Sequence, residues 1–296
     1  WKNCKVAIKE LTGRTLHRLS SDPVDTQADK STAELVEKFR SEVRVLSQLH
    51  HPNIIILLGA CTEYPNLCIV TEYAPSGSLN DVLRQKNNNL EWHITTDLQM
   101  LWLLETASGM SYLHGQGIMH RDLKSHNVLV CSEQHLKLCD FGMARTNNEI
   151  EAARTMTQGV GSLLWMAPEV LLQQDYSFSA DVFSWAIVAW EIMSPGQVVH
   201  AGKSAFQVSQ SVVQGDRPPL QPSWPAGVHV LLSRAWQSDP LRRPSFEEIV
   251  LQIAPLVKDM AHFDSERSLS DARSSTSHPP FSIGDDSLET PLLLID

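Results

Sequence analysis

Residues 120–127 read HRDLKSHN, and Asp140-Phe141-Gly142 follows thirteen positions after Asn127. These two acidic turns limit what the chain can fold into more than any other feature, because both must face one site to act together. The carboxylate of Asp122 could accept a proton from a hydroxyl group. Asn127 and Asp140 offer oxygen ligands, which suit a hard cation such as Mg²⁺. The pair of segments therefore predicts a site for hydroxyl chemistry beside a divalent metal.

Near the start of the chain, residues 5–10 alternate briefly and are rich in Val and Ile, which predicts a strand. Lys9 lies in this strand, within VAIK at residues 6–9. A lysine buried there would need a counter-charge, and Glu42 on the next predicted helix is a suitable partner. Taken singly, the two have ordinary interpretations, a strand-edge lysine and a solvated carboxylate. In this order with the acidic turns, they predict an ion pair.

Apolar spacing predicts a small strand-rich part followed by a larger helical part, joined near Tyr73–Gly77. Thr12–Lys30 is polar and predicts a long loop or insertion, and Ser31 with Glu34 predicts a capping box that begins a helix ending before His51-Pro52. The other predicted elements are strands at Ile54–Leu58 and Asn66–Tyr73, a hairpin of Val128–Val130 and Leu136–Leu138, and helices at Asp97–Gly115, Ala180–Met193, Val228–Gln237 and Ser245–Leu256.

Composition and charge exclude several classes. The net charge is −10 and no stripe of Lys and Arg is visible, which argues against a nucleic-acid surface. The longest apolar runs are too short to span a bilayer, so we expect no membrane segment within the chain. The start, WKNCKVAIKE, is no signal peptide and lacks an initiator Met, which favours a chain cut from a longer protein.

The cysteines and histidines argue against structural metal and disulfides. The five cysteines are scattered without a CxxC, which disfavours a disulfide framework or a zinc site and favours a reducing, cytoplasmic compartment. His114, His120 and His126 recur at six-residue spacing, which matches no metal-binding motif. We therefore interpret His120 as a packing residue.

The last forty residues differ from the rest. Residues 257–296 hold eight Asp and Glu against three Lys and Arg and are rich in Ser. Such a segment buries too little apolar surface to offset its ordering entropy, so we expect disorder. The predicted organisation is thus a strand-rich part at residues 1–73 (with the insertion at about 12–30), a helical part at 74–257 and an acidic tail at 258–296.

VAIK, HRDLKSHN, DFG and Ala167-Pro168-Glu169 occur in the order found in protein kinases. Residues 1–256 resemble a eukaryotic protein kinase domain without its first two strands. HRDLKSHN, DFGMAR, GSLLWMAPE and DVFSWAIVAWEI resemble the tyrosine-kinase-like group, which includes Raf-like and mixed-lineage kinases and is mostly Ser/Thr-specific. The resemblance implies an α+β, two-lobed fold with a truncated N-lobe and a mainly helical C-lobe.

The same resemblance implies ATP and Mg²⁺ as cofactors and proteins as substrates, and it leaves the oligomeric state unknown. Lys124 and Ser162 favour Ser/Thr specificity. Lys9, with Glu42 as its counter-charge, would hold the ATP phosphates, Asp122 would be the base and Lys124 would meet the transferring phosphoryl group. Asn127 and Asp140 would bind the metal.

Further roles follow from the resemblance alone. The adenine pocket would comprise Ala7, Thr71 as gatekeeper, the hinge Glu72-Tyr73-Ala74, and Leu129. A regulatory column would comprise Leu46, Leu57, His120 and Phe141. Asp181, Glu169 and Arg243 would be structural, and Arg121 would respond to phosphorylation at Thr155 or Thr157.

One part of the pattern is absent, because no glycine-rich GxGxxG precedes Lys9 and Gly13 lies after it. The first hypothesis is an enzyme, part of a longer active kinase. The alternative is a truncated, non-catalytic scaffold or regulatory module. A small-molecule kinase is disfavoured, because GSLLWMAPE and the region of Arg243 fit a polypeptide substrate.

Overall fold

The computed structural model describes residues 5–10, 26–63, 66–84, 94–131, 134–142, 144–146, 160–174 and 177–257. Contacts divide the chain into two units, residues 1–257 and residues 258–296. All described residues belong to the first unit. Within this part of the chain, no helix is both long enough and apolar enough to cross a membrane.

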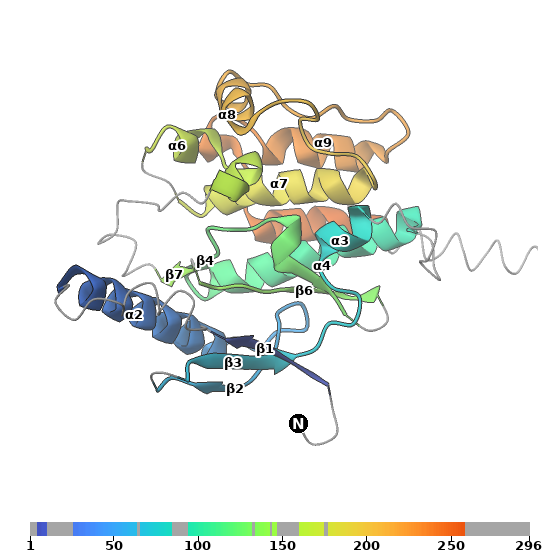
Figure 1. Ribbon diagram of the computed structural model, residues 1–296. Helices are drawn as coiled ribbons and strands as arrows, with labels where there is room; N and C mark the ends of the chain where they lie inside the picture. The colour runs from blue at the N-terminus through green and yellow to red at the C-terminus, as the bar shows by residue number, and fades with distance from the viewer. Residues whose placement is uncertain are drawn as a thin grey trace, which may run out of the picture. The chain divides into compact units, whose positions relative to one another are not determined.

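An antiparallel sheet occupies the N-terminal part of this unit (Figure 1). It consists of β1 (Val6–Glu10), β2 (Leu57–Cys61) and β3 (Cys68–Glu72), in the order β1-β3-β2. The strand predicted at Asn66–Tyr73 is confirmed as β3. The register sets Ala7 opposite Thr71, and Cys61 opposite Cys68. The sheet therefore joins a strand from the start of the chain to a hairpin fifty residues later.

The strand predicted at Ile54–Leu58 is wrong in its first half. Strand β2 begins only at Leu57, whereas Ile54 forms a parallel bridge with Leu138 and the N–H of Ile55 donates to the carbonyl of Leu138 at 2.9 Å. The first residues of this apolar run pair with Leu138, far along the chain, and only the later residues enter the sheet as β2. Both isoleucines are buried at this junction.

Helix α2 (Thr26–Gln48) begins earlier than the sequence predicts. The expected loop at Thr12–Lys30 is wrong over its last five residues, while residues 11–25 lie outside the described ranges. The capping box at Ser31 is also wrong, because this residue lies inside the helix. Further along, Phe39, Glu42 and Leu46 are buried, at the spacing of three to four residues that one helix face requires.

The C-terminal part of the unit is a stack of helices (Figure 1). The predicted helices are confirmed, with ends shifted by one or two residues, as α4 (Thr96–Gly115), α7 (Ser179–Met193), α9 (Ala226–Ala235) and helical residues 246–257. The sequence did not predict α3 (Leu79–Arg84), α6 (Pro168–Leu171) and α8 (Ala205–Val213).

The centre of this stack is α7, nearly all of whose residues are buried, including Asp181 and Glu191. It packs against α4 and α9. The buried rings of Trp102, Phe183, Trp185 and Phe246 fill the interior. The indole N–H of Trp185 donates to Thr106 Oγ1 at 3.0 Å, so these two buried polar groups of α7 and α4 are paired with each other.

Short elements carry the two acidic motifs. Strands β5 (Val128–Val130) and β6 (Leu136–Leu138) form the hairpin that the sequence predicted. Strand β4 (Ile118–Met119), before this hairpin in the sequence, pairs with β7 (Arg145–Thr146), which follows it. The remaining short elements are the 3₁₀ turns η1 (Ser125–Asn127), η3 (Val160–Trp165) and η4 (Pro240–Arg242).

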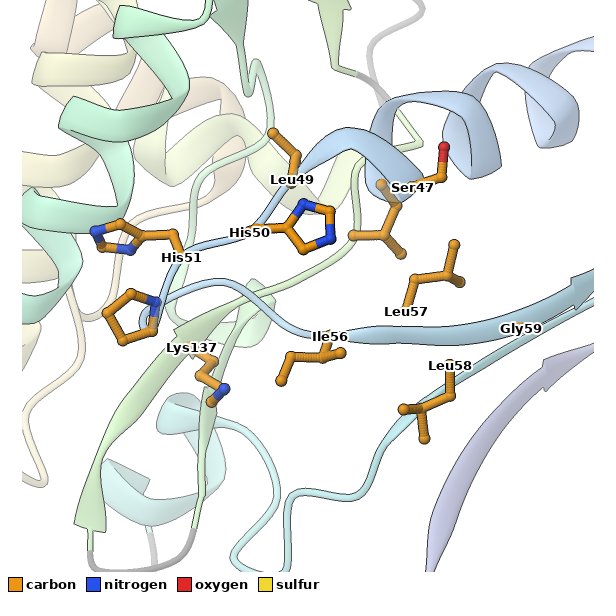
Figure 2. A pocket seen from close by; sticks show the side chains of 11 residues that line it. Ser47, Leu49, His50, His51, Ile56, Leu57, Leu58, Gly59 and Lys137 are labelled. Carbon is orange, nitrogen blue, oxygen red and sulfur yellow. The ribbon is translucent and has the colours of Figure 1, made fainter.

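A cavity of about 480 Å³ lies between the end of α2 and strand β2 (Figure 2). Leu57 and Leu58 reach it from β2, His50 and His51 from the segment after α2, and Lys137 from β6. Its lining thus includes no residue of the two acidic motifs.

Candidate active site

Lys9 connects three segments of the chain. Its Nζ lies 2.7 Å from Glu42 Oε1 and 3.0 Å from Asp140 Oδ1. Strand β1 supplies the lysine, α2 supplies Glu42, and the turn after β6 supplies Asp140. The side chain of Glu42 is 9% exposed, whereas that of Asp140 is 45% exposed. The structure therefore brings the predicted ion pair together and adds Asp140 to it.

Charge and burial act differently on these three groups. The side chain of Lys9 is 52% exposed, so it is not the buried lysine that the sequence suggested. Its partial burial alone would lower its pKa, but the charges of Asp140 and Glu42 outweigh this effect and raise the pKa. Burial raises the pKa of Glu42 despite the nearby ammonium group. Burial would likewise raise the pKa of Asp140, but the charge and hydrogen bond of Lys9 lower it overall. Asp140 is therefore held as a carboxylate, the form that binds a cation.

Asp122 is held by two donors from its own loop. Its Oδ2 accepts from Lys124 Nζ at 2.7 Å and from Asn127 Nδ2 at 3.0 Å. The same amide of Asn127 donates to the carbonyl of Asp122 at 2.8 Å. Lys124 Nζ also donates to Ser162 Oγ at 3.0 Å, which links the loop to η3. The side chains of Asp122 and Lys124 are each less than a fifth exposed. The loop thus fixes the carboxylate beside a cation.

The carboxylate of Asp181, near the start of α7, holds the backbone of this loop. It accepts from the N–H of His120 and from the N–H of Arg121, both at 2.9 Å, and contacts His114 Nε2 at 3.0 Å. These bonds, with the charge of His114, overcome complete burial and lower the pKa of Asp181. Arg121 has a φ of 68°, a left-handed conformation that is unfavourable for a non-glycine residue.

Asp140 has a φ of 62°, so the second acidic motif is strained in the same way. Its neighbour Phe141 is 1% exposed and packs on the ring of His120 at a centroid distance of 5.4 Å. His120 Nε2 lies 3.3 Å from the carbonyl of Cys139. The two motifs are therefore joined through His120. Of the expected column, Leu46 is buried as well, and Leu57 is half-buried.

The residues expected around adenine lie on both sides of the connection that follows β3. Ala7 is the cross-strand neighbour of Thr71, and Leu129 forms an antiparallel bridge with Ser78, just after the expected hinge. Ala74 and Leu129 are half-buried, and Tyr73 is 45% exposed. This places β1, the end of β3 and β5 around the same connection.

Sequence reasoning missed the role of the Glu72 side chain. Its Oε1 accepts from Lys137 Nζ and from the N–H of Ile56, both at 2.8 Å. The side chain thus ties β3 to β6 and to the segment before β2. No periodic pattern marks such a contact, because the three segments are far apart in sequence.

The expected structural pair is well formed. Arg243 Nη1 and Nη2 contact the two oxygens of Glu169 at 2.7 and 2.8 Å, with both side chains buried. Arg243 Nη1 also donates to the carbonyl of Ser179 at 2.9 Å, so the guanidinium connects α6 to the start of α7. Thr155 and Thr157 lie outside the described residues.

The three spaced histidines have separate partners. His114 contacts Asp181, His120 packs on Phe141, and His126 meets the ring of Trp165 edge-on at 5.5 Å. Within the described residues, no group of three or more His, Cys, Asp or Glu side chains is arranged to hold a metal ion. A site made by these histidines is therefore not formed.

Asn127 and Asp140 nevertheless suit Mg²⁺. The amide nitrogen of Asn127 is oriented by Asp122, which leaves Oδ1 as the group that can bind a cation. The backbone carbonyl of Asn127 accepts from the N–H of Cys139 at 2.9 Å, which connects Asn127 to the residue before Asp140. Two oxygen ligands match the way in which Mg²⁺ binds, with water and substrate phosphates completing its shell.

Comparisons with known proteins agree with this arrangement. The profile of the family "Protein tyrosine and serine/threonine kinase" matches residues 23–253. A probable serine/threonine-protein kinase of Dictyostelium discoideum is 37% identical over 251 residues, which are 84% of this chain and 25% of that protein. The serine/threonine-protein kinase STY17 of Arabidopsis thaliana is 37% identical over 81% of this chain and 40% of its own length.

A third relative, the serine/threonine/tyrosine-protein kinase HT1 of Arabidopsis thaliana, is 35% identical over 77% of this chain and 57% of its own length. The chain thus spans about a quarter to little more than half of these relatives. Together with the ordered motifs and the residues that they bring into contact, the family profile shows that the chain belongs to the protein tyrosine and serine/threonine kinases, as a kinase domain of the tyrosine-kinase-like type.

Proposed function

We propose that the chain transfers the γ-phosphoryl group of ATP to Ser and Thr hydroxyls of protein substrates. The observation that carries this proposal is the position of Lys9 Nζ, which contacts both Glu42 and Asp140 at 3.0 Å or less. Phosphoryl transfer depends on positioning and charge neutralisation more than on covalent help, and this cluster supplies both.

ATP would lie between the sheet and the helical part. The backbone of Glu72-Tyr73-Ala74 would hold adenine, with Ala7, Thr71 and Leu129 around the ring. Lys9, oriented by Glu42, would bind phosphate oxygens. Asn127 and Asp140 would hold Mg²⁺, which supplies neutralisation of phosphate charge when bound.

Asp122 would accept the proton of the substrate hydroxyl while the hydroxyl oxygen attacks the γ-phosphorus and ADP leaves. Lys124 contacts Asp122 Oδ2 at 2.7 Å and would stabilise the negative charge of the phosphoryl group as it passes. The hydrogen bond from Lys124 to Ser162 keeps this cation beside the segment expected to receive the substrate. This hydrogen bond supports a Ser/Thr acceptor, as does the naming of two relatives as serine/threonine-protein kinases.

Two measurements on the full chain test the proposal. The first is the thermal shift with Mg-ATP, where ligand at a hundredfold excess over its Kd should add about 2.7 kcal/mol and raise Tm by roughly 5–10 °C. The second is transfer of labelled phosphate to casein, followed by phosphoamino-acid analysis. We expect phosphoserine and phosphothreonine.

Two substitutions separate binding from chemistry. Asp140→Ala should abolish the shift, because it removes a metal ligand. Asp122→Asn should keep the shift and lower transfer by about 10²–10⁴-fold, because it removes the base. A shift without any transfer in the unsubstituted chain would instead indicate the non-catalytic scaffold or regulatory module.

A further inference from the structure

Cys61 and Cys68 lie directly opposite each other across the β2–β3 hairpin. They are Cα partners in the antiparallel register, at the end of the ladder nearest the turn. Both are free thiols and both are half-buried. Strand β2 is an edge strand of the described sheet. The two thiols thus belong to one cross-strand pair of the hairpin.

The spacing of such a pair suits a disulfide. Directly opposed residues of an antiparallel pair have Cα atoms about 4.5–5.5 Å apart, and their side chains point to the same face. A disulfide spans Cα atoms about 4.4–6.8 Å apart. The usual Cβ spacing of such a pair, about 4.5–5.5 Å, starts at the upper limit for a disulfide, about 4.5 Å, and extends above it, so the bond would be strained and readily reduced.

We propose that Cys61 and Cys68 form a reversible intrachain disulfide when the chain meets a peroxide. One thiol reacts with hydrogen peroxide to give a sulfenic acid and one water. The second thiol attacks this sulfur, the S–S bond forms, and the hydroxyl group leaves as a second water. Two thiols are oxidised by two electrons, and one peroxide is reduced. The inference does not depend on catalysis.

The thiol of Cys61 has to rotate away from its present contact to reach its partner. Its Sγ points along the turn toward the carbonyl of Glu63, at 3.9 Å, a weak contact for a thiol. The register already pairs the two Cα atoms at a spacing within the range that a disulfide spans. The hairpin therefore supplies the geometry, and the oxidant supplies the chemistry.

Two other cysteines provide a contrast within the same chain. Burial raises the pKa of Cys131 to about 11 and that of Cys139 to about 12. Because the thiolate is the form that reacts with peroxide, these two should be oxidised slowly. They lie in or beside the β5–β6 hairpin but are not register partners of each other.

The bond would stabilise the sheet without closing the proposed nucleotide site. Cys68 begins β3, and the expected hinge follows the other end of that strand, at Glu72. The crosslink acts mainly by restricting the unfolded chain. We expect the oxidised chain to melt about 5 °C higher than the reduced chain, and a dithiol reductant to reverse the shift.

Peptide mapping tests the proposal on the full chain. Residues 45–84 contain no Lys or Arg before Arg84, so trypsin releases both cysteines in one peptide. The chain is treated with a small excess of hydrogen peroxide, alkylated under denaturing conditions, digested and weighed. The expected peptide carries no alkyl group and is two hydrogen atoms lighter than the reduced form.

Serine variants identify the partners. Cys61→Ser and Cys68→Ser should each eliminate the lighter peptide and the thermal shift, whereas Cys131→Ser should retain both. Cys4→Ser, at a position outside the described residues, should retain both as well. The proposal is overturned if both thiols of the oxidised peptide are alkylated, if only higher sulfur acids form, or if non-reducing gels show crosslinked dimers instead.

Discussion

At the scale of single residues, a buried carboxylate sets the backbone conformation of the HRD segment. Asp181 accepts the backbone N–H groups of two consecutive residues, His120 and the left-handed Arg121. The strain at Arg121 persists because these bonds fix its neighbours. A side chain on α7 therefore positions Asp122 without touching it.

We predict that Asp181→Asn lowers the free energy of unfolding by about 3 kcal/mol, because an amide cannot accept both N–H groups and leaves a buried donor unpaired. Chemical denaturation measures this change. Asp216→Asn is the matched control, since Asp216 pairs with Lys203 at the surface and should cost less than about 1 kcal/mol. Equal losses in the two variants would contradict the role given to burial.

The residues that the sequence could predict are those grouped in short runs. HRDLKSHN, DFG and VAIK name Asp122, Asn127, Asp140 and Lys9 directly, and the structure brings the partners of Lys9 together. The contacts of the Glu72 side chain could not be predicted. They depend on where the ends of β3 and β6 meet, and no local pattern records that position.

At the scale of elements, periodicity predicted the existence of most helices and strands but not their ends. The run Ile54–Leu58 is apolar throughout, and the sequence does not show that Ile54 pairs with Leu138 while Leu57 begins β2. At α2, Ser31 and Glu34 form a local capping pattern, but a serine inside a helix costs so little that the helix continues past it. In both places, pairing or helix continuation over a longer stretch of chain decided where the element begins, and the local sequence pattern did not.

The contact of α4 with β6 depends on a glycine. A Cβ added at Gly109 would lie 2.9 Å from the carbonyl oxygen of Asn53 and 2.9 Å from Leu138 Cδ1. Asn53 cannot withdraw easily, because its carbonyl accepts the N–H of Leu138 and its amide donates to the carbonyl of Leu136. Helix α4 can therefore approach the β5–β6 hairpin this closely only because residue 109 has no side chain.

We predict that Gly109→Ala destabilises the chain by about 1–3 kcal/mol through overpacking, despite the better helix propensity of alanine. The midpoint of urea unfolding measures the change. Gly115→Ala, in the same helix, provides the comparison, because nothing lies within 4 Å of its added Cβ. That variant should be neutral or slightly stabilised, and a loss of similar size there would refute the packing argument.

At the scale of the whole molecule, one buried acid couples stability to pH. Glu191 on α7 accepts from the indole N–H of Trp165 at 2.8 Å, and burial raises its pKa from 4.5 to about 7. The folded state thus favours the protonated form. Its contribution to stability is fully present below about pH 4.5 and is lost as pH rises through 7, by about 3 kcal/mol in total.

We predict that Glu191→Gln reduces this loss, because glutamine keeps an oxygen for Trp165 and cannot ionise. Denaturation at about pH 5.5 and about pH 8 measures the difference between the two chains. Glu247→Gln, an exposed position on the last described helix, is the control and should follow the unsubstituted chain. An unchanged pH dependence in Glu191→Gln would contradict the prediction.

The contacts of Lys9 also bear on the order of folding. The pair with Glu42 closes a separation of 33 residues, and the pair with Asp140 closes one of 131 residues. Contacts between residues so distant in sequence form slowly, because the entropy of loop closure is lost before any contact compensates it. We therefore expect the lysine cluster to assemble after the β2–β3 and β5–β6 hairpins, so that in a newly made chain the proposed active site is complete only when folding is nearly finished.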